Sequence, residues 1–194
     1  MRFVAVRPLS TPSRPAHARS VSSMEELLER NRSFAATDAR DRLPAIPFIP
    51  NRQLYVITCI DPRVDPAVVL GLDLGDAIVA RNVGGRVTPA VLQDLGWITH
   101  LHRTKTPDAG WFELVVIHHT DCGSALLADD ELRHGFATAG GFDDAELAAL
   151  AVTDPDTTVK TDVETLRASP MLDARVSVSG YVYDVATGRC AARS

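Results

Sequence analysis

The stretch "QLYVITC", residues 53–59, decides the fold class, because it is an apolar run in which β-branched and aromatic residues predominate. Its apolar character is continuous instead of alternating, which is typical of a strand covered on both faces in a parallel sheet. Three more runs predict strands, and the last of them alternates enough to lie nearer an edge: "DAIVAR" (76–81), "FELVVIHH" (112–119) and "RVSVSGYVYDV" (175–185).

Helix signals lie between these strands, and each begins with a capping residue or a proline in the first turn. They predict helices over 66–71, 89–103 and about 157–168, the last opened by Asp156. Strand and helix therefore alternate. We expect an α/β fold with a central, largely parallel β-sheet of about four to five strands flanked by helices, and a ligand site outside the carboxyl ends of the strands.

The first 23 residues differ from the rest, since they contain four arginines, three prolines and no acidic residue. We interpret 1–23 as a disordered basic tail and 24–194 as one domain. An S-x-x-E capping pattern predicts a helix over 24–37. The stretch 41–51 contains three prolines and predicts an extended linker, so this N-terminal helix is expected to pack on a partner subunit.

Composition limits the partners and the compartment. A formal net charge of -5 gives no electrostatic reason for nucleic-acid binding, and no apolar run approaches the roughly 20 residues that cross a bilayer. We therefore expect a small-molecule substrate or a protein partner. Cys59, Cys122 and Cys190 cannot all pair, and no hydrophobic signal segment precedes them, which favours a reducing cytoplasm.

Side chains with metal-ligand chemistry follow two of the predicted strands. Cys59 ends the first strand, and His119 and Cys122 stand at the end of the third with two residues between them. Zinc accepts two thiolates and one imidazole, and three protein ligands leave the fourth position for water or substrate. This set predicts one Zn²⁺ per chain and a zinc-bound hydroxide as nucleophile. His118 points to the opposite face of its strand and is interpreted as a core or supporting residue.

The segment after Cys59 carries a carboxylate and a guanidinium. In an extended chain Asp61 would reach toward the metal, where a free carboxylate would take the fourth position. Arg63 can hold it in a bidentate pair, which leaves Asp61 to orient the hydroxide. Further along, "RNVGG" (81–85) supplies backbone N–H groups and two glycines, and we interpret Asn82, Val83, Gly84 and Gly85 as a wall of the substrate pocket. A plain structural turn is the alternative for the two glycines.

Three motifs in this order resemble the β-class carbonic anhydrases: C-x-D-x-R (59–63), R-N-x-G-G (81–85) and H-x-x-C-G (119–123). The resemblance implies a zinc enzyme that interconverts carbon dioxide and bicarbonate, built as a homodimer or a dimer of dimers. It implies Cys59, His119 and Cys122 as zinc ligands and Asp61 with Arg63 as the catalytic dyad.

The chain also departs from the family pattern. Pro62 stands where a small residue is more usual, Val83 replaces a frequent alanine, and Pro50 occupies the position of a substrate-binding glutamine in the plant-like branch. The chain therefore looks like the smaller prokaryotic branch.

Three alternatives remain open from the sequence. The same zinc set serves relatives that hydrolyse carbonyl sulfide or carbon disulfide. Asp61 could close onto zinc and leave the protein catalytically silent. A metal-free Cys-His hydrolase would need Cys59 or Cys122 as a free nucleophile beside a histidine base.

Overall fold

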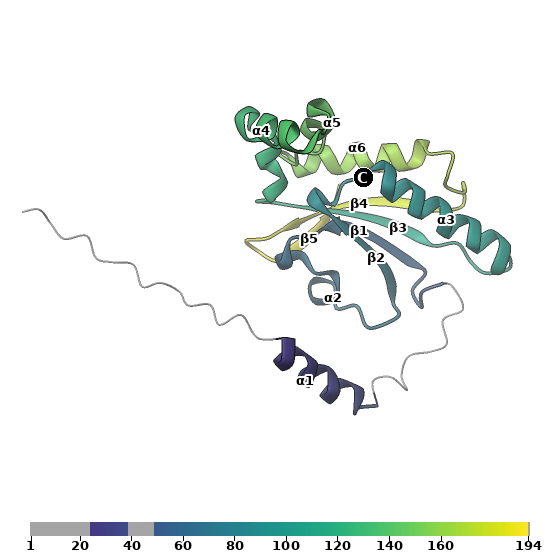
Figure 1. Ribbon diagram of the computed structural model, residues 1–194. Coiled ribbons are helices and arrows are strands. Elements are labelled where there is room, and N and C mark those ends of the chain that lie inside the picture. The colour runs from purple at the N-terminus through teal and green to yellow at the C-terminus, as the bar shows by residue number, and fades with distance from the viewer. Residues whose placement is uncertain (1–23, 39–48, 194) are drawn as a thin grey trace, which may run out of the picture. The chain divides into compact units, whose positions relative to one another are not determined.

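The computed structural model describes residues 24–38 and 49–193, and a five-stranded sheet lies at its centre (Figure 1). The first four strands are parallel to their neighbours, and the last is antiparallel and forms one edge. This confirms the α/β prediction. The strands, in spatial order, are β2 (Ala77–Asn82), β1 (Leu54–Cys59), β3 (Glu113–His119), β4 (Ser177–Asp184) and β5 (Arg189–Ala192).

Both faces of the central strands are buried, as the continuous apolar runs predict. Tyr55 and Ile57 of β1 face a core cluster that α3 (Pro89–Lys105) and α6 (Pro155–Ala168) cover from one side of the sheet (Figure 1). Val56 belongs to a second cluster on the other side. Strand β1, packed on both faces, therefore holds Cys59 and the start of the segment after it in a fixed position.

The predicted helices are present, but some boundaries differ. Helix α2 (Pro66–Val69) is shorter than predicted, and α3 is slightly longer. Assigning Asp156 as the opening residue of α6 was wrong: Asp154 is the cap, because its carboxylate accepts from the N–H of Asp156 while Pro155 occupies the first helical position.

Several elements were not predicted. Helices α4 (Asp130–Gly140) and α5 (Asp144–Ala149) lie between β3 and α6. Strand β5 pairs back onto β4 and is the fifth strand of a sheet predicted to have four to five. Three 3₁₀ turns follow strand ends: η1 (Pro62–Val64), η2 (Val83–Gly85) and η3 (Gly123–Ala128). These turns carry the residues that surround the candidate site.

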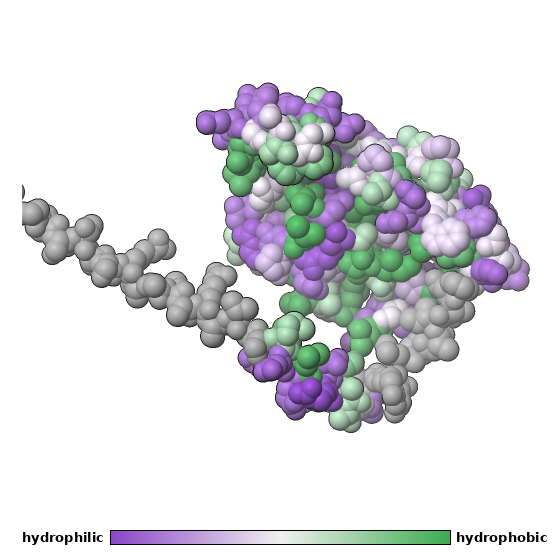
Figure 2. All heavy atoms as spheres, viewed as in Figure 1, coloured by the Kyte–Doolittle hydropathy of each residue, from purple (hydrophilic) through white to green (hydrophobic). Residues whose placement is uncertain are grey.

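Helix α1 (Met24–Ala35) belongs to a different compact unit from the sheet. None of its residues is buried, and Figure 2 shows apolar side chains beside charged ones on its surface. It ends two residues before the predicted boundary. The tail predicted over 1–23 and the linker up to residue 48 lie outside the described residues. No helix in the described ranges combines the length and the apolar character that a membrane span requires.

Candidate metal centre

The sheet brings the two cysteines and the histidine together at its carboxyl edge. Cys59 is the last residue of β1 and His119 the last of β3, which pair in parallel register. Cys122 caps the following turn η3, three residues beyond His119. The side-chain ligand atoms of these three residues all lie within 4.8 Å of one another, and all three residues are buried.

The geometry of this set fits a tetrahedral zinc ion. The two sulfur atoms are 3.9 Å apart. Two ligands at zinc–sulfur distances of about 2.3 Å in a tetrahedron would be separated by about 3.8 Å. The Nδ1 atom of His119 donates to the carbonyl of Thr120 at 2.9 Å, which leaves Nε2 as the acceptor nitrogen. That Nε2 atom is buried and has no hydrogen-bond partner among residues 24–38 and 49–193, which fits a nitrogen whose role is to bind a metal.

The hydrogen bond between the two thiols moves their pKa values in opposite directions. A hydrogen bond from Cys59 lowers the pKa of Cys122 to about 6. The same contact, together with burial, raises the pKa of Cys59 to about 11. One thiolate is therefore available at neutral pH, and the second proton must be displaced by a cation, so that metal binding releases protons.

Arg63 and Asp61 form the expected bidentate pair, although the backbone route to it differs from the expectation. The chain is extended only to Asp61, which caps the 3₁₀ turn η1 and accepts from the N–H of Arg63 at 2.9 Å. Within this turn the guanidinium folds back, and its Nε and Nη2 atoms donate to the carboxylate at 3.0 and 2.7 Å. These bonds from Arg63 lower the pKa of Asp61 to about 2, so Asp61 is an anion at any physiological pH.

A second carboxylate, not predicted, also holds Arg63. Its Nη1 atom donates to Asp121 at 2.7 Å, and its Nη2 atom donates to the carbonyl of Asp121 at 2.9 Å. Asp121 adopts φ 55°, a left-handed conformation that aspartate tolerates better than most residues. Arg63 thus joins the turn after Cys59 to the turn before Cys122.

The loop after β2 packs against the backbone of the zinc-ligand strand. Gly84 and Gly85 are buried and have φ of 79° and 67°. A Cβ atom on Gly85 would lie 2.7 Å from the backbone nitrogen of Cys59. The side chain of Asn82 closes the loop by bonding the N–H and the carbonyl of Arg86, both at 2.8 Å. The close approach to the backbone of Cys59 is therefore enough to explain why residue 85 is glycine. Of the four predicted wall residues, only Val83 is largely exposed, at 51%.

Arg81, in the same motif, has a role that sequence reasoning missed. Its Nε atom donates to the carbonyl of Cys59 at 3.0 Å, and its Nη2 atom donates to the carbonyl of Asp61 at 2.7 Å. Its Nη1 atom bonds Asp65. The R-N-V-G-G motif marks Arg81 in the sequence. That it binds the carbonyls of Cys59 and Asp61 follows only from the strand register, which places Cys59 opposite Asn82.

His118 is a supporting residue, as predicted. It is fully buried, with its ring nitrogens 2.8 Å from the Thr158 hydroxyl and 3.1 Å from the Asp162 carboxylate. Asp162 also binds Arg86 and the N–H of Val87. This buried network ties β3 and the loop after β2 to α6.

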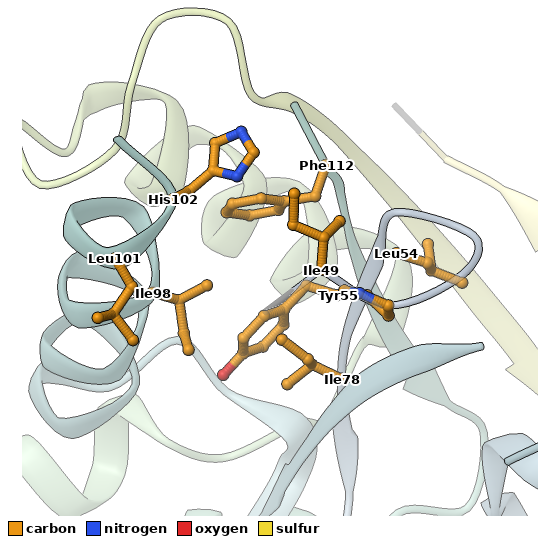
Figure 3. A pocket seen from close by; sticks show the side chains of 9 residues that line it. Ile49, Leu54, Tyr55, Ile78, Ile98, Leu101, His102 and Phe112 are labelled. Atoms are coloured by element: carbon orange, nitrogen blue, oxygen red, sulfur yellow. The ribbon is translucent and has the colours of Figure 1, made fainter. Parts of the chain in front are cut away.

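Two further features lie outside the cluster. Cys190 is exposed on β5. A cavity of about 40 Å³ lies near the amino ends of β1 and β2, lined mainly by apolar side chains such as Ile78 and Phe112 (Figure 3). His102 lines it, but its Nδ1 atom is bonded to the Thr106 hydroxyl. This cavity brings together no set of catalytic groups comparable with the cluster at the carboxyl edge.

Comparisons with known proteins agree with this geometry. The family profile described as "Carbonic anhydrase" matches residues 54–190. The chain is 30% identical to beta-carbonic anhydrase 1 of Mycobacterium tuberculosis, over 74% of this chain and 83% of that protein. It is 32% identical to the carbon disulfide hydrolase of an Acidianus species, over 72% and 76% of the two chains.

A solved structure extends the likeness beyond sequence. The carbonic anhydrase of Streptococcus mutans matches with a TM-score of 0.70 and 30% identity, over 88% of this chain and 97% of that chain. The family match runs from β1 into β5 and includes the whole Cys-His-Cys cluster. The chain therefore belongs to the β-class carbonic anhydrase family.

Proposed function

We propose that the protein catalyses the reversible hydration of carbon dioxide to bicarbonate, with one zinc ion held by Cys59, His119 and Cys122. The observation that carries this proposal is the buried cluster itself, whose ligand atoms lie within 4.8 Å of one another. Within the described residues, the Nε2 atom of His119 has no hydrogen-bond partner. When bound there, zinc would act as a Lewis acid that lowers the pKa of water to about 7.

Asp61 and Arg63 have complementary roles in this proposal. The Asp61 carboxylate accepts a hydrogen bond from the attacking oxygen and orients it toward carbon dioxide. Arg63 keeps that carboxylate ionised and engaged, through two side-chain donors and one backbone N–H. A carboxylate held in this way competes poorly for the fourth zinc position, which supports an active enzyme over a protein silenced by Asp61.

The loop after β2 forms one wall of the substrate pocket. Gly85 brings this wall against the backbone of Cys59, and Asn82 keeps the loop closed. Val83 is the member whose side chain is exposed enough to meet a small apolar molecule. Carbon dioxide has no hydrogen-bond donor, so a wall of this kind can admit it without a polar partner for each atom.

Stopped-flow hydration of carbon dioxide with an indicator dye tests the proposal. Zinc-loaded protein should accelerate the reaction between pH 7 and 9, and the Cys190→Ser variant, which alters an exposed thiol away from the cluster, should match wild type. A zinc-loaded protein no faster than buffer in that range would contradict the assignment.

Hydrolysis of carbon disulfide or carbonyl sulfide is the second candidate. A specific observation favours it, namely the 32% identity to the Acidianus carbon disulfide hydrolase. The Cys-His-Cys ligand set is suited to carbon dioxide and to carbon disulfide or carbonyl sulfide alike, so the ligands alone do not identify the substrate. The family description and the likeness to the Streptococcus mutans enzyme favour carbon dioxide. Release of sulfide from carbon disulfide, measured beside hydration, separates the two.

The assembly and the compartment are part of the proposal. The protein acts in the cytoplasm, where Cys59 and Cys122 stay reduced, as a homodimer or a dimer of dimers. The 24–194 region works as one domain whose α1 packs on the partner subunit. In support, Leu28 and Phe34 of α1 are 48% and 43% exposed. Light scattering should give at least twice the chain mass, and Phe34→Asp should lower it.

A further inference from the structure

Ser124 places a buried hydroxyl against one of the candidate zinc ligands. The residue lies in η3 and is 4% exposed. Its Oγ atom is 3.1 Å from the sulfur of Cys122. A buried hydroxyl therefore lies within hydrogen-bond distance of a candidate ligand atom.

The direction of the hydroxyl bond is fixed once a metal is bound. A cysteine that binds zinc is a thiolate and carries no hydrogen. The serine hydroxyl has one hydrogen to give, so Ser124 must be the donor and Cys122 the acceptor. The side chain of Ser124 has no other hydrogen-bond partner in the described part of the chain.

The surrounding residues leave this hydroxyl little freedom. A Cβ atom on Gly84 would lie 2.9 Å from the Ser124 Oγ atom, so a glycine at this position makes room for the hydroxyl. The same Cβ atom would lie 3.2 Å from a methyl group of Val152, which packs with Cys122 in an apolar cluster. In such low-dielectric surroundings a hydrogen bond to a charged sulfur is stronger than it would be in water.

We propose that Ser124 is a positioning residue that donates a hydrogen bond to the Cys122 thiolate and thereby limits the negative charge this ligand gives to the metal. Outer hydrogen bonds of this kind orient a ligand and tune the metal it binds. Ser124 would make the zinc ion a stronger Lewis acid than the same ligand set without the hydroxyl. The inference rests on the proposed zinc site.

Cobalt(II) substitution tests the bond directly, because a thiolate bound to cobalt gives a charge-transfer absorption band whose energy reports the electron density on sulfur. Ser124→Ala should move this band to longer wavelength, since the sulfur lone pairs lose their donor. Zinc affinity, measured by competition with a chromophoric chelator, should fall about tenfold in the same variant, because Cys122 loses the hydrogen bond that orients it for the metal. Gly84→Ala, which crowds the hydroxyl out of place, should move the band in the same direction.

Ser179→Ala is the matched control, since its hydroxyl lies on β4 and bonds Glu113, which begins β3 and is not a residue of the cluster. Its cobalt band should coincide with that of wild type. Identical bands in wild type and Ser124→Ala would overturn the role of Ser124 while leaving the metal site intact. The absence of any thiolate-to-cobalt band in wild type would overturn the metal site, and the proposal with it.

Discussion

Replacing Gly85 with alanine would place a methyl group inside the backbone of the strand that carries Cys59. The new Cβ atom would lie 2.7 Å from the nitrogen of Cys59 and 2.7 Å from the carbonyl carbon of Thr58. These are main-chain atoms of a strand that is paired on both sides, with β2 and with β3, so they cannot move aside as a flexible side chain would.

Two separate costs follow from this position. Gly85 has φ 67°, and an L-residue in the left-handed region costs roughly 1–2 kcal/mol. Overpacking of a well-packed site costs about 1–3 kcal/mol more. We therefore expect Gly85→Ala to lower the free energy of unfolding by roughly 2–5 kcal/mol, and the melting temperature by roughly 4–20 °C for a chain of this size.

Gly71→Ala isolates the first cost, that of the left-handed backbone conformation. Gly71 has φ 65°, almost the same as Gly85, but a Cβ atom there would have nothing within 4 Å. In this variant the free energy of unfolding should fall by only about 1–2 kcal/mol. Thermal unfolding by circular dichroism, with the zinc content of each sample measured, compares the two. Equal melting temperatures for the two variants would refute the close approach of Gly85 to Cys59.

The remaining predictions concern the ligands and the dyad. Arg63→Ala should retain zinc but lose hydration activity by roughly 100-fold or more, because it frees Asp61 to coordinate; zinc content and stopped-flow rates check this, and full activity would contradict it. Cys122→Ser should lose zinc affinity in a chelator competition, whereas Cys190→Ser should not. In the metal-free protein the Asp61 carboxyl should titrate near pH 2 instead of at its ordinary pKa of 3.8. The stability that its pairing with Arg63 contributes is therefore fully present above pH 3.8, and it is lost as the pH falls through about 2. Carbon-13 NMR should show that pKa returning toward 3.8 in Arg63→Ala, and an unchanged midpoint would exclude the pair as its cause.

The sheet and the ligand cluster could be predicted because their signals are local. A strand buried on both faces is apolar throughout, and β1 and β3 have this character. Parallel strands end at one edge, so Cys59 and His119 follow from the strand assignments alone. Only the choice between His118 and His119 required the alternation of side chains along β3.

Other features depend on contacts between distant segments. Asp162 meets Arg86 and His118 across 76 and 44 residues, and no local pattern marks it as their partner. The position of Ser124 beside Cys122 depends on how η3 turns. Helices α4 and α5 are a different case, because Asp129 and Asp143 cap them and Gly141 ends the first in a left-handed conformation. Those signals were present in the sequence and could have predicted both helices.

X-ray absorption at the zinc edge of the purified wild-type protein near pH 8 tests the central claim most directly. The account predicts one zinc per chain with two sulfur neighbours at about 2.3 Å, one imidazole nitrogen at about 2.0–2.1 Å and one oxygen that does not belong to the protein. A spectrum without sulfur neighbours would contradict it, as would a fourth ligand supplied by Asp61 at that pH.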